Sequence, residues 1–494
     1  MKLSERQRQG IQLSAMVAVS MLSQVIGIFK SSVVAANFGA GMELDSYNFA
    51  TSLITFVTSL VTNGITVVVI PAYIKKADRK DVDSFVTLLF IVSGVILTLL
   101  AAFAFPLASF LAGRGESFSS YVAGVMPFAI VIQAIPMFLG LTTAYYQCEN
   151  RFNTPKVILL VSNVVVACAL LLIHDFSIYE YLMILITGAL VQFVLDLSIA
   201  LKLGFRYRPR FSWTNKGTRS LVAVFLPTMF SSSVYAASTL IDSVISSGLG
   251  EGYVTILTYA NNLVGMVNTL IIGNLSTYAY PKIVKAVEGG DGEASQNKLW
   301  NYSAILHAIV CFVIVCFIAG GRELIGLLFE HGKFTSDAAD MVFICMAIFI
   351  FSQQLNIVRD LIYRYFYALG DTVSTFKNSF SASVVNALAS VALSVPFGLY
   401  GVIFGTVISG TFSLCSIILR LSRKQGLSTT TKRFALIMAK SAAITVAACA
   451  VTYLAKCFLG DCGELIGLLL FGSVGAMSYL ALTIVFNRKA FEIA

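Results

Sequence analysis

Long apolar segments, separated by charged residues, glycine or proline, recur along the chain from residue 11 to residue 487. A helix crosses the hydrocarbon core of a bilayer with about 20 predominantly apolar residues, so each segment of that length predicts one transmembrane helix. Fourteen such segments lie at residues 11–36, 46–72, 84–112, 119–147, 156–174, 180–203, 219–248, 253–281, 300–328, 338–366, 373–396, 400–422, 433–456 and 463–487. We therefore expect an all-α, polytopic membrane protein.

The composition agrees with this pattern and assigns an orientation to it. Of 494 residues 57% are hydrophobic and 12% are charged, whereas soluble domains carry roughly 25% charged residues. When the loops are counted alternately, only four of the 34 lysines and arginines fall on one side, namely Arg114, Arg322, Lys333 and Lys456. The positive-inside rule then predicts that both termini are cytoplasmic. The net charge of +9 reflects this topology and contact with anionic membrane lipids, rather than binding of nucleic acid.

Motifs of covalent chemistry are missing from the sequence. The three histidines are far apart and have no metal-ligand spacing, so no metal site is predicted. There is no nucleotide-binding loop and no nucleophile elbow. We expect no enzyme, no catalytic residue and no bound cofactor, and we expect transport to depend on a coupling cation (Na⁺ or H⁺), the membrane potential or the substrate gradient. Cys457 and Cys462 share one predicted outer loop, and the sequence leaves open whether they form a disulfide.

Two sequence echoes indicate an internal repeat. Residues 50–77 resemble residues 260–286 at an offset of 210, and Pro71 matches Pro281 at the end of the predicted helix. Residues 145–152 resemble residues 365–372 at an offset of 220. Since the two echoes occur in the same order, they predict two related halves in the same orientation.

The repeat predicts a division of the chain into three parts. Residues 1–218 form an N-terminal lobe of six helices, residues 219–428 form a second six-helix lobe, and residues 429–494 form two additional helices. Parallel repeats of this kind place the substrate between the lobes and work by rocking motions.

Ionisable residues inside the predicted helices are candidates for function, because a charge in hydrocarbon is costly. Lys30 lies in the first helix, Asp45 begins the second, and Asp196 lies deep in the sixth. Two of them have structural alternatives that stay open. For Asp45 the structural alternative is that it caps the start of a helix. For Asp196 it is a polar contact between packed helices.

Asp242 is the strongest acidic candidate, because it lies inside the seventh predicted helix without a basic neighbour in sequence. With Asn386 and Thr406 of later helices it would supply carboxylate, amide and hydroxyl oxygens, which suit a dehydrated monovalent cation. These three residues are the predicted ion-coupling site. A packing hydrogen bond is the alternative.

Arg359 and Arg364 lie near the cytoplasmic end of the tenth predicted helix. Long basic side chains at such a position reach the aqueous interface, which is the simpler interpretation. The functional alternative is that both arginines meet a phosphate group at the cytoplasmic entrance.

Four segments carry a resemblance to a known family. Ser23–Gly27, Ala36–Asp45, Val69–Pro71 and Leu328–Thr335 resemble motifs of the MurJ lipid II flippases, which belong to the multidrug/oligosaccharidyl-lipid/polysaccharide exporter superfamily. The resemblance covers the first twelve predicted helices.

The resemblance implies two lobes in a V shape, alternating access and a cationic cavity in the bacterial inner membrane. That cavity would receive the diphosphate of an undecaprenyl-linked glycan, and a groove beside the last two helices would hold the lipid tail. Enzymes of cell-wall synthesis are implied partners. Arginine suits such a site because it binds phosphate with two hydrogen bonds.

The family's cavity residues carry over only in part. Its arginines fall here at Gln24, Lys30 and Asn262 and near residues 57–58, so only Lys30 keeps a positive charge, while Asp45 matches an acidic position. The resemblance thus implies substrate binding by these four named residues. Lysine binds phosphate as a point charge and with less selectivity than arginine.

Three classes of function remain at this point. The first is a flippase for an undecaprenyl-diphosphate-linked glycan, with lipid II as the first candidate and an O-antigen, capsular or teichoic-type unit as the second. The second is a cation-coupled multidrug or metabolite antiporter, in which the acidic residues would matter and Lys30 would not. The third is a membrane scaffold without transport, which has little reason to carry intramembrane charges.

Overall fold

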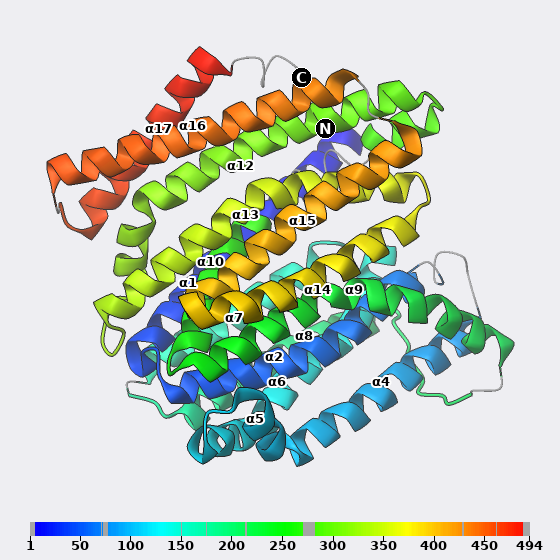
Figure 1. Ribbon diagram of the computed structural model, residues 1–494. Coiled ribbons are helices and arrows are strands. Elements are labelled where there is room, and N and C mark those ends of the chain that lie inside the picture. The colour runs from blue at the N-terminus through cyan, green and yellow to red at the C-terminus, as the bar shows by residue number, and fades with distance from the viewer. Residues whose placement is uncertain are drawn as a thin grey trace. The chain divides into compact units, whose positions relative to one another are not determined.

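The computed structural model describes residues 5–70, 72, 78–149, 151–173, 175–212, 215–269, 282–426, 429–460 and 462–487, with the side chains of 5–17, 63, 66–67, 227–235 and 429 left aside. Throughout these ranges every regular element is a helix, which confirms the all-α prediction (Figure 1). The helices are α1 (Glu5–Phe38), α2 (Met42–Gly64), η1 (Ile65–Val69), α4 (Arg79–Ala102), α5 (Ala104–Ala112), α6 (Glu116–Cys148), α7 (Thr154–Leu172), α8 (Ile178–Lys202), α9 (Lys216–Leu249), α10 (Tyr253–Val267), α12 (Gly292–Phe329), α13 (Ser336–Ala368), α14 (Thr372–Phe397), α15 (Leu399–Gln425), α16 (Thr429–Leu459) and α17 (Glu464–Phe486).

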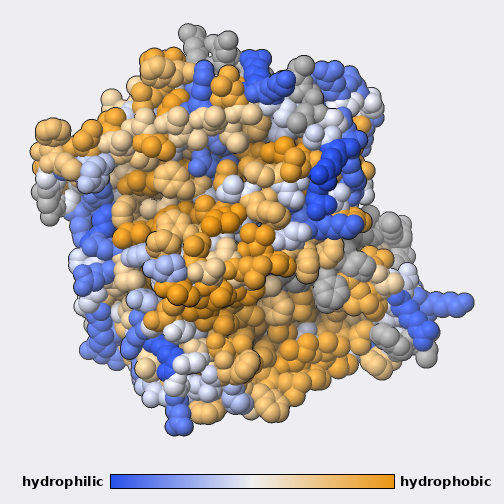
Figure 2. Space-filling model, in the orientation of Figure 1, coloured by the Kyte–Doolittle hydropathy of each residue, from blue (hydrophilic) through white to orange (hydrophobic). Residues whose placement is uncertain are grey.

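Eleven helices within the described ranges are long and apolar enough to span a membrane. The three other predicted spans, 46–72, 219–248 and 253–281, correspond to α2 with η1, to α9 and to α10. Spans 46–72 and 253–281 include residues outside the described set, and the side chains of 227–235 in span 219–248 are left aside. The exact number of fourteen therefore stays a prediction. Figure 2 shows hydrophobic side chains over most of the face in view and hydrophilic ones toward the edges, where helices end.

The predicted span at 84–112 is wrong in one respect, because two helices occupy it. The break falls at Phe103, between α4 and α5, where the backbone leaves the helical region (φ −106°, ψ 17°). Pro106 explains it, since its ring clashes with the carbonyl of residue 102 in a continuous helix and its nitrogen has no hydrogen to donate.

A π-helical segment, η1, interrupts the helix predicted at 46–72. Gly64, just before it, packs directly against Phe225 of α9, since a Cβ at Gly64 would lie 2.3 Å from the Phe225 ring. Phe225 also packs edge-on against Phe85 of α4, with ring centroids 5.7 Å apart. Only glycine permits this approach of α2 to α9.

The chain forms two compact units, Met1–Thr255 and Ile256–Ala494. In the first, α2 packs against α6 and α9, and α7 packs against α1 and α8. In the second, α14 pairs with α15, and α12 contacts α13, α16 and α17. The division falls after the expected boundary at residue 218, because α9 packs against α2, α4 and α5. The division into lobes of 1–218, 219–428 and 429–494 stays a prediction.

The second sequence echo has a counterpart in local structure. At the end of α6 the Arg151 backbone N–H donates to the Tyr146 carbonyl at 2.8 Å, and at the end of α13 the Asp371 N–H donates to the Phe366 carbonyl at 2.9 Å. Both turns are of the type that closes a helix through a six-residue hydrogen bond. Pro71 and Pro281 of the first echo lie outside the described residues.

The last two helices pack on α12 through specific contacts. The Tyr479 hydroxyl of α17 donates to the Ala308 carbonyl at 2.8 Å, and Trp300 stacks on Phe434 of α16 at 4.9 Å between centroids. These contacts explain why residues 429–487 belong to the second compact unit.

Candidate substrate and ion sites

Asp45 lies in the first turn of α2 and is fully buried, with 0% of its surface exposed. Its Oδ2 accepts hydrogen bonds from Arg114 Nη1 at 2.8 Å and from the Gly252 backbone N–H at 2.7 Å. Its Oδ1 accepts a third, from the Thr255 N–H at 2.9 Å. Gly252 and Thr255 stand at the start of α10, where free N–H groups and the helix dipole favour a negative charge. The carboxylate is therefore neutralised by groups of its own compact unit.

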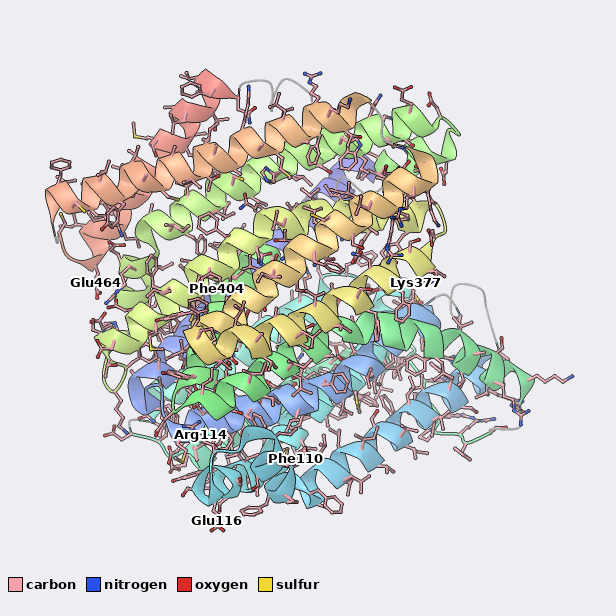
Figure 3. All side chains as sticks on the ribbon, viewed as in Figure 1. Phe110, Arg114, Glu116, Lys377, Phe404 and Glu464 are labelled. Atoms are coloured by element: carbon pink, nitrogen blue, oxygen red, sulfur yellow. The ribbon has the colours of Figure 1, made fainter. Side chains whose placement is uncertain are left out.

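A second contact ties the same two helix starts together. The Met42 N–H, at the start of α2, donates to Glu251 Oε1 at 3.0 Å. Gly252 adopts a positive φ of 83° and approaches Ala40 closely, since a Cβ there would lie 2.5 Å from the Ala40 carbonyl oxygen. Arg114, which reaches Asp45, lies in the turn between α5 and α6, and Figure 3 labels it there. Together these contacts form what we call the Asp45 cluster: Asp45, Arg114, Glu251, Gly252 and Thr255.

Lys30 makes a different kind of contact. Its Nζ donates to Asn163 Oδ1 of α7 at 2.6 Å, and the Asn163 amide donates to Ser23 Oγ of α1 at 2.8 Å. Lys30 is half-buried, and it is part of none of the ion pairs among the described residues. Its positive charge is thus solvated by an amide but not neutralised.

The same interface holds a second lysine. Lys156 Nζ of α7 donates to Ser20 Oγ of α1 at 3.0 Å. Lys156 is also half-buried and, like Lys30, takes part in none of the ion pairs among the described residues. We call Ser20, Ser23, Lys30, Lys156 and Asn163 the α1–α7 seam.

The other two residues implied by the resemblance are Gln24 and Asn262. Gln24 is half-buried on α1, one residue after Ser23, and Asn262 is exposed on α10. Gln24 and Asn262 belong to different compact units. Their part in substrate binding stays a prediction.

The predicted ion site is divided between the two compact units. In the second unit Asn386 Nδ2 of α14 donates to Thr406 Oγ1 of α15 at 3.0 Å. Asn386 is 2% exposed, and its Oδ1 is a buried acceptor without a hydrogen-bond partner. Asp242 is buried in α9 of the first unit, next to Ser243, whose hydroxyl lies 2.8 Å from the Ser52 hydroxyl. The assignment of Asp242, Asn386 and Thr406 to ion coupling stays a prediction.

Arg359 is engaged on its own helix. Its Nη2 lies 3.1 Å from Asp360 Oδ1, and its guanidinium lies 5.7 Å from the centroid of the Tyr363 ring. Arg359 is thus partly neutralised, which is compatible with the simpler interpretation of an interfacial arginine. Arg364 lies one turn further along α13 and is half-buried.

Asp196 of α8 is 2% exposed and contacts α6. The Tyr146 hydroxyl donates to the Asp196 backbone carbonyl at 2.8 Å, whereas the buried Oδ2 of the Asp196 carboxyl group has no hydrogen-bond partner among the described residues. The Tyr146 contact agrees with the open alternative of a polar contact between packed helices.

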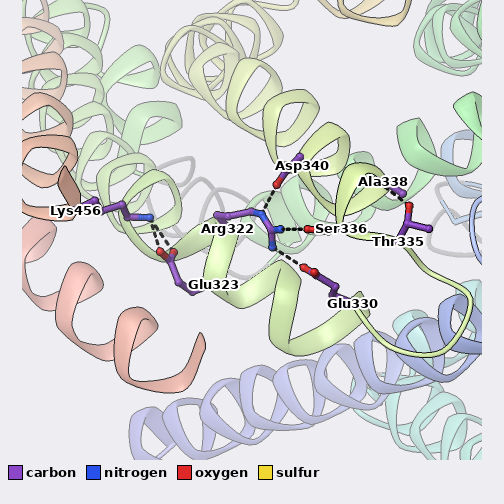
Figure 4. A network of polar contacts seen from close by, with 8 residues as sticks. All are labelled: Arg322, Glu323, Glu330, Thr335, Ser336, Ala338, Asp340 and Lys456. Carbon is purple, nitrogen blue, oxygen red and sulfur yellow. Dashed lines mark hydrogen bonds and ion pairs between the residues drawn. The ribbon is translucent and has the colours of Figure 1, made fainter. Parts of the chain in front are cut away.

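The motif at residues 328–335 connects α12 to α13 through Arg322 (Figure 4). Arg322 Nη1 lies 2.9 Å from Glu330 Oε2, its Nη2 donates to Ser336 Oγ at 3.0 Å, and its Nε pairs with Asp340. Burial opposes ionisation of Glu330, but hydrogen bonds from Ser336 and Arg322 prevail and lower its pKa. The Glu330 carboxylate of this motif is therefore paired and helps to fix the turn.

A second ion pair stands beside this turn. Lys456 of α16 contacts both carboxylate oxygens of Glu323, at 2.7 and 2.9 Å. Cys457 and Cys462, near the same end of α16, are free thiols.

A family model described as "Lipid II flippase MurJ" matches residues 34–471. The chain belongs to the lipid II flippase MurJ family. Two similar proteins are the "Probable lipid II flippase MurJ" of Synechocystis sp., 24% identical over 83% of this chain and 81% of that protein, and the "Lipid II flippase MurJ" of Burkholderia cenocepacia, 23% identical over 83% and 82%. The resemblance noted in the sequence is thereby confirmed.

Solved structures give the same fold for the MurJ-family chain. A lipid II flippase MurJ in an inward closed conformation superposes with a TM-score of 0.79 and 19% identity, covering 97% of this chain and 99% of that one. An inward-facing multidrug resistance MATE family transporter of the MOP superfamily gives a TM-score of 0.66 and 13% identity, over 83% and 98%. The MurJ fold matches over more of the chain and more closely than this MATE fold.

Three residues of these sites were not singled out from the sequence. In the sequence Arg114 stands out only as a charge in a predicted outer loop, and Lys156 and Asn163 lie within a predicted apolar span. The spacing of Lys156 and Asn163, seven residues apart and so on one helix face, is the signal that could have found them.

Proposed function

We propose that this chain carries lipid II, an undecaprenyl-diphosphate-linked glycan, from the cytoplasmic to the outer leaflet of a bacterial inner membrane by alternating access. Family membership supports this proposal, as does the MurJ fold along the whole chain. In the proposed orientation both termini are cytoplasmic, as the loop charges predict.

The observation that carries the proposal is the unneutralised ammonium group of Lys30 inside a membrane helix. An isolated charge in this setting is costly unless it serves a ligand or an ion pathway. The diphosphate of a lipid-linked glycan supplies the missing negative charge, and Lys30 occupies a position where the family carries an arginine. We therefore assign Lys30 the role of a primary contact to the diphosphate.

A coupling cation is the second part of the proposal. Its proposed residues are Asp242 in the first compact unit and Asn386 with Thr406 in the second. The buried, unpartnered Oδ1 of Asn386 favours this role, because an orphaned acceptor is costly unless a donor or a cation binds it. Na⁺ or H⁺ at this site would drive the return of the empty transporter.

A cation antiporter is the alternative that the shared MATE fold raises. A cationic solute would not need Lys30, and its recognition would depend on acidic residues. The acidic Asp45 is occupied by Arg114 and two backbone N–H groups, which disfavours this alternative.

Depletion of the protein followed by mass spectrometry of polyprenyl-linked precursors tests the proposal. We expect lipid II to accumulate while other lipid-linked glycans keep their usual level. Accumulation of an O-antigen or capsule precursor instead would identify that precursor, and not lipid II, as the substrate. If no lipid-linked glycan accumulates while export of an organic cation fails, the chain is an antiporter.

A further inference from the structure

The α1–α7 seam contains two ammonium groups and no carboxylate. Lys30 is bonded to Asn163, and Lys156 is bonded to Ser20. Both lysines are half-buried, so each still offers part of its surface to a ligand. A lysine has three N–H donors, so each ammonium keeps donors for an anion beyond the one bond it makes here.

Five other basic residues in the helices and their turns are paired with acids, whereas exposed lysines such as Lys377 take part in none of the ion pairs among the described residues. Arg114 has Asp45, Arg322 has Glu330 and Asp340, Arg359 has Asp360, Lys424 has Asp371 and Lys456 has Glu323. Unlike these five residues, Lys30 and Lys156 have no carboxylate partner among the described residues. Membrane proteins keep unpaired charges where a ligand or an ion completes the pair.

The spacing of the seam suits an elongated anion. Lys156 and Asn163 are seven residues apart on α7, which is two turns, or about 10 Å along the axis. Lys30 Nζ reaches Asn163 Oδ1, and Ser23 and Lys30 are likewise seven residues apart on α1. Since lysine side chains are long and flexible, an anion with two charged groups can contact both ammonium ions while the hydroxyls of the seam donate to its oxygens.

We propose that Lys156 supplies the second positive charge of the diphosphate site, so that Lys30 and Lys156 together replace the arginines that the family carries elsewhere in the cavity. This inference rests on the proposed function, because it names a further residue of the same substrate site. The chemistry recognised is a diphosphate esterified at both ends, whose two phosphoryl groups bear one negative charge each. A phosphatidylglycerol headgroup, with a single phosphate, contacts one ammonium only.

A binding experiment with the purified full-length protein in detergent tests the inference. Native mass spectrometry measures the Kd for lipid II and for phosphatidylglycerol in wild type, Lys30→Gln, Lys156→Gln, Lys156→Arg and Lys377→Gln. Lys377 is an exposed lysine near the start of α14 and serves as the matched control (Figure 3). We expect Lys30→Gln and Lys156→Gln each to weaken lipid II binding by about tenfold, while Lys156→Arg and Lys377→Gln bind as wild type does.

Other results overturn the inference in distinguishable ways. If Lys30→Gln weakens lipid II binding and Lys156→Gln does not, Lys156 is outside the site and the proposed function stands. If Lys156→Gln weakens phosphatidylglycerol binding only, Lys156 is an interfacial lipid contact. If wild type binds no lipid II, the proposed function fails and the inference fails with it.

A second measurement uses the unmodified protein, so it does not depend on the folding of a variant. Lysine acetylation, followed by peptide mass spectrometry, compares Lys30, Lys156 and Lys377 with and without lipid II. We expect lipid II to slow acetylation of Lys30 and Lys156 by about tenfold and to leave Lys377 unchanged. Equal labelling of Lys156 in both conditions contradicts the inference.

Discussion

The Asp45 cluster and the α1–α7 seam lie in the same compact unit and treat charge in opposite ways. Asp45 has no exposed surface and receives hydrogen bonds from Arg114, Gly252 and Thr255. Lys30 and Lys156 are half-exposed, and among the described residues their ammonium groups donate to an amide and to a hydroxyl. The carboxylate of the first cluster is paired inside the protein, whereas the two ammonium groups of the second have no carboxylate partner among the described residues.

This difference separates structural from binding residues better than residue type does. Asp45 and Lys30 were both candidates because an ionisable side chain inside a membrane helix is costly. Their partners show that the cost is met inside the protein for Asp45. For Lys30 it would be met by the substrate. Substitutions should therefore affect stability in the first cluster and binding in the second.

The largest effect is expected for Asp45→Ala. It leaves the Arg114 guanidinium, whose side chain is 11% exposed, without its carboxylate and leaves two N–H groups of α10 without an acceptor. Removing one partner of a buried ion pair costs about 3–5 kcal/mol. Chemical unfolding in detergent measures this loss. The double variant Asp45→Asn with Arg114→Gln serves as the control and should recover part of it, and an unchanged stability of Asp45→Ala would break the comparison.

The second prediction concerns the α1–α7 seam, where substitution is expected not to lower the free energy of unfolding. Lys30→Met with Lys156→Met removes two unneutralised charges from a membrane interface, so we expect stability to be unchanged or raised by up to about 2 kcal/mol. The same unfolding assay measures it. A loss of more than about 2 kcal/mol would mean that the lysines hold α1 on α7, and the seam would then be structural like the Asp45 cluster.

Arg322 sharpens the comparison with a third, half-exposed network. Arg322→Gln removes contacts to Glu330, Ser336 and Asp340, and its side chain is 27% exposed. We expect a loss of about 1 kcal/mol, because solvent screens such pairs. Arg322→Lys keeps the charge without the planar fork and should lose about half as much in the same unfolding assay. If the Gln and Lys variants are equally stable, the positive charge at position 322 does not contribute to stability, and this explanation is excluded.

The smallest effect is expected at Asp371, which caps α14 and pairs with Lys424 of α15. Burial opposes its ionisation, but hydrogen bonds from Lys424 and Ser374 prevail and lower its pKa from 3.8 to about 2. The carboxylate therefore stabilises the fold above about pH 4, and this contribution is lost as the pH falls toward 2. Because Lys424 is 52% exposed, the contribution is below about 1 kcal/mol.

Lys424→Gln tests this pH dependence. The stability difference between wild type and variant should narrow as the pH falls from 4 to 2, whereas Lys440→Gln, a substitution of an exposed lysine on α16, should give a difference that does not change over that range. A constant difference for Lys424→Gln would show that the pair does not control the Asp371 pKa.

Much of the fold could be predicted from the sequence because a transmembrane helix is specified locally. The segment at 119–147 is a continuous apolar run, and α6 occupies it. The break at Phe103 also has a local cause in Pro106, but the apolar run continues through it, so hydropathy alone did not separate α4 from α5. The π-helix at Ile65–Val69 has no comparable mark in the sequence.

The sites could be predicted only in part, because partners come from distant positions. Lys30 and Asp45 were identified from their charge, but Asp45 is neutralised by Arg114, 69 residues away, and by N–H groups more than 200 residues away. Asn163 lies 133 residues from Lys30. Which distant residues meet depends on which helices pack together, and hydropathy does not specify which helices become neighbours.

Transport by a Lys30 variant tests the central claim most directly. In a strain whose own lipid II flippase is depleted, the outward-exposed fraction of lipid II is measured with wild type, Lys30→Arg or Lys30→Gln at matched membrane levels. We predict that wild type and Lys30→Arg restore exposure, while Lys30→Gln falls by about tenfold or more without loss of the folded protein. Exposure by Lys30→Gln equal to that of wild type would contradict the account.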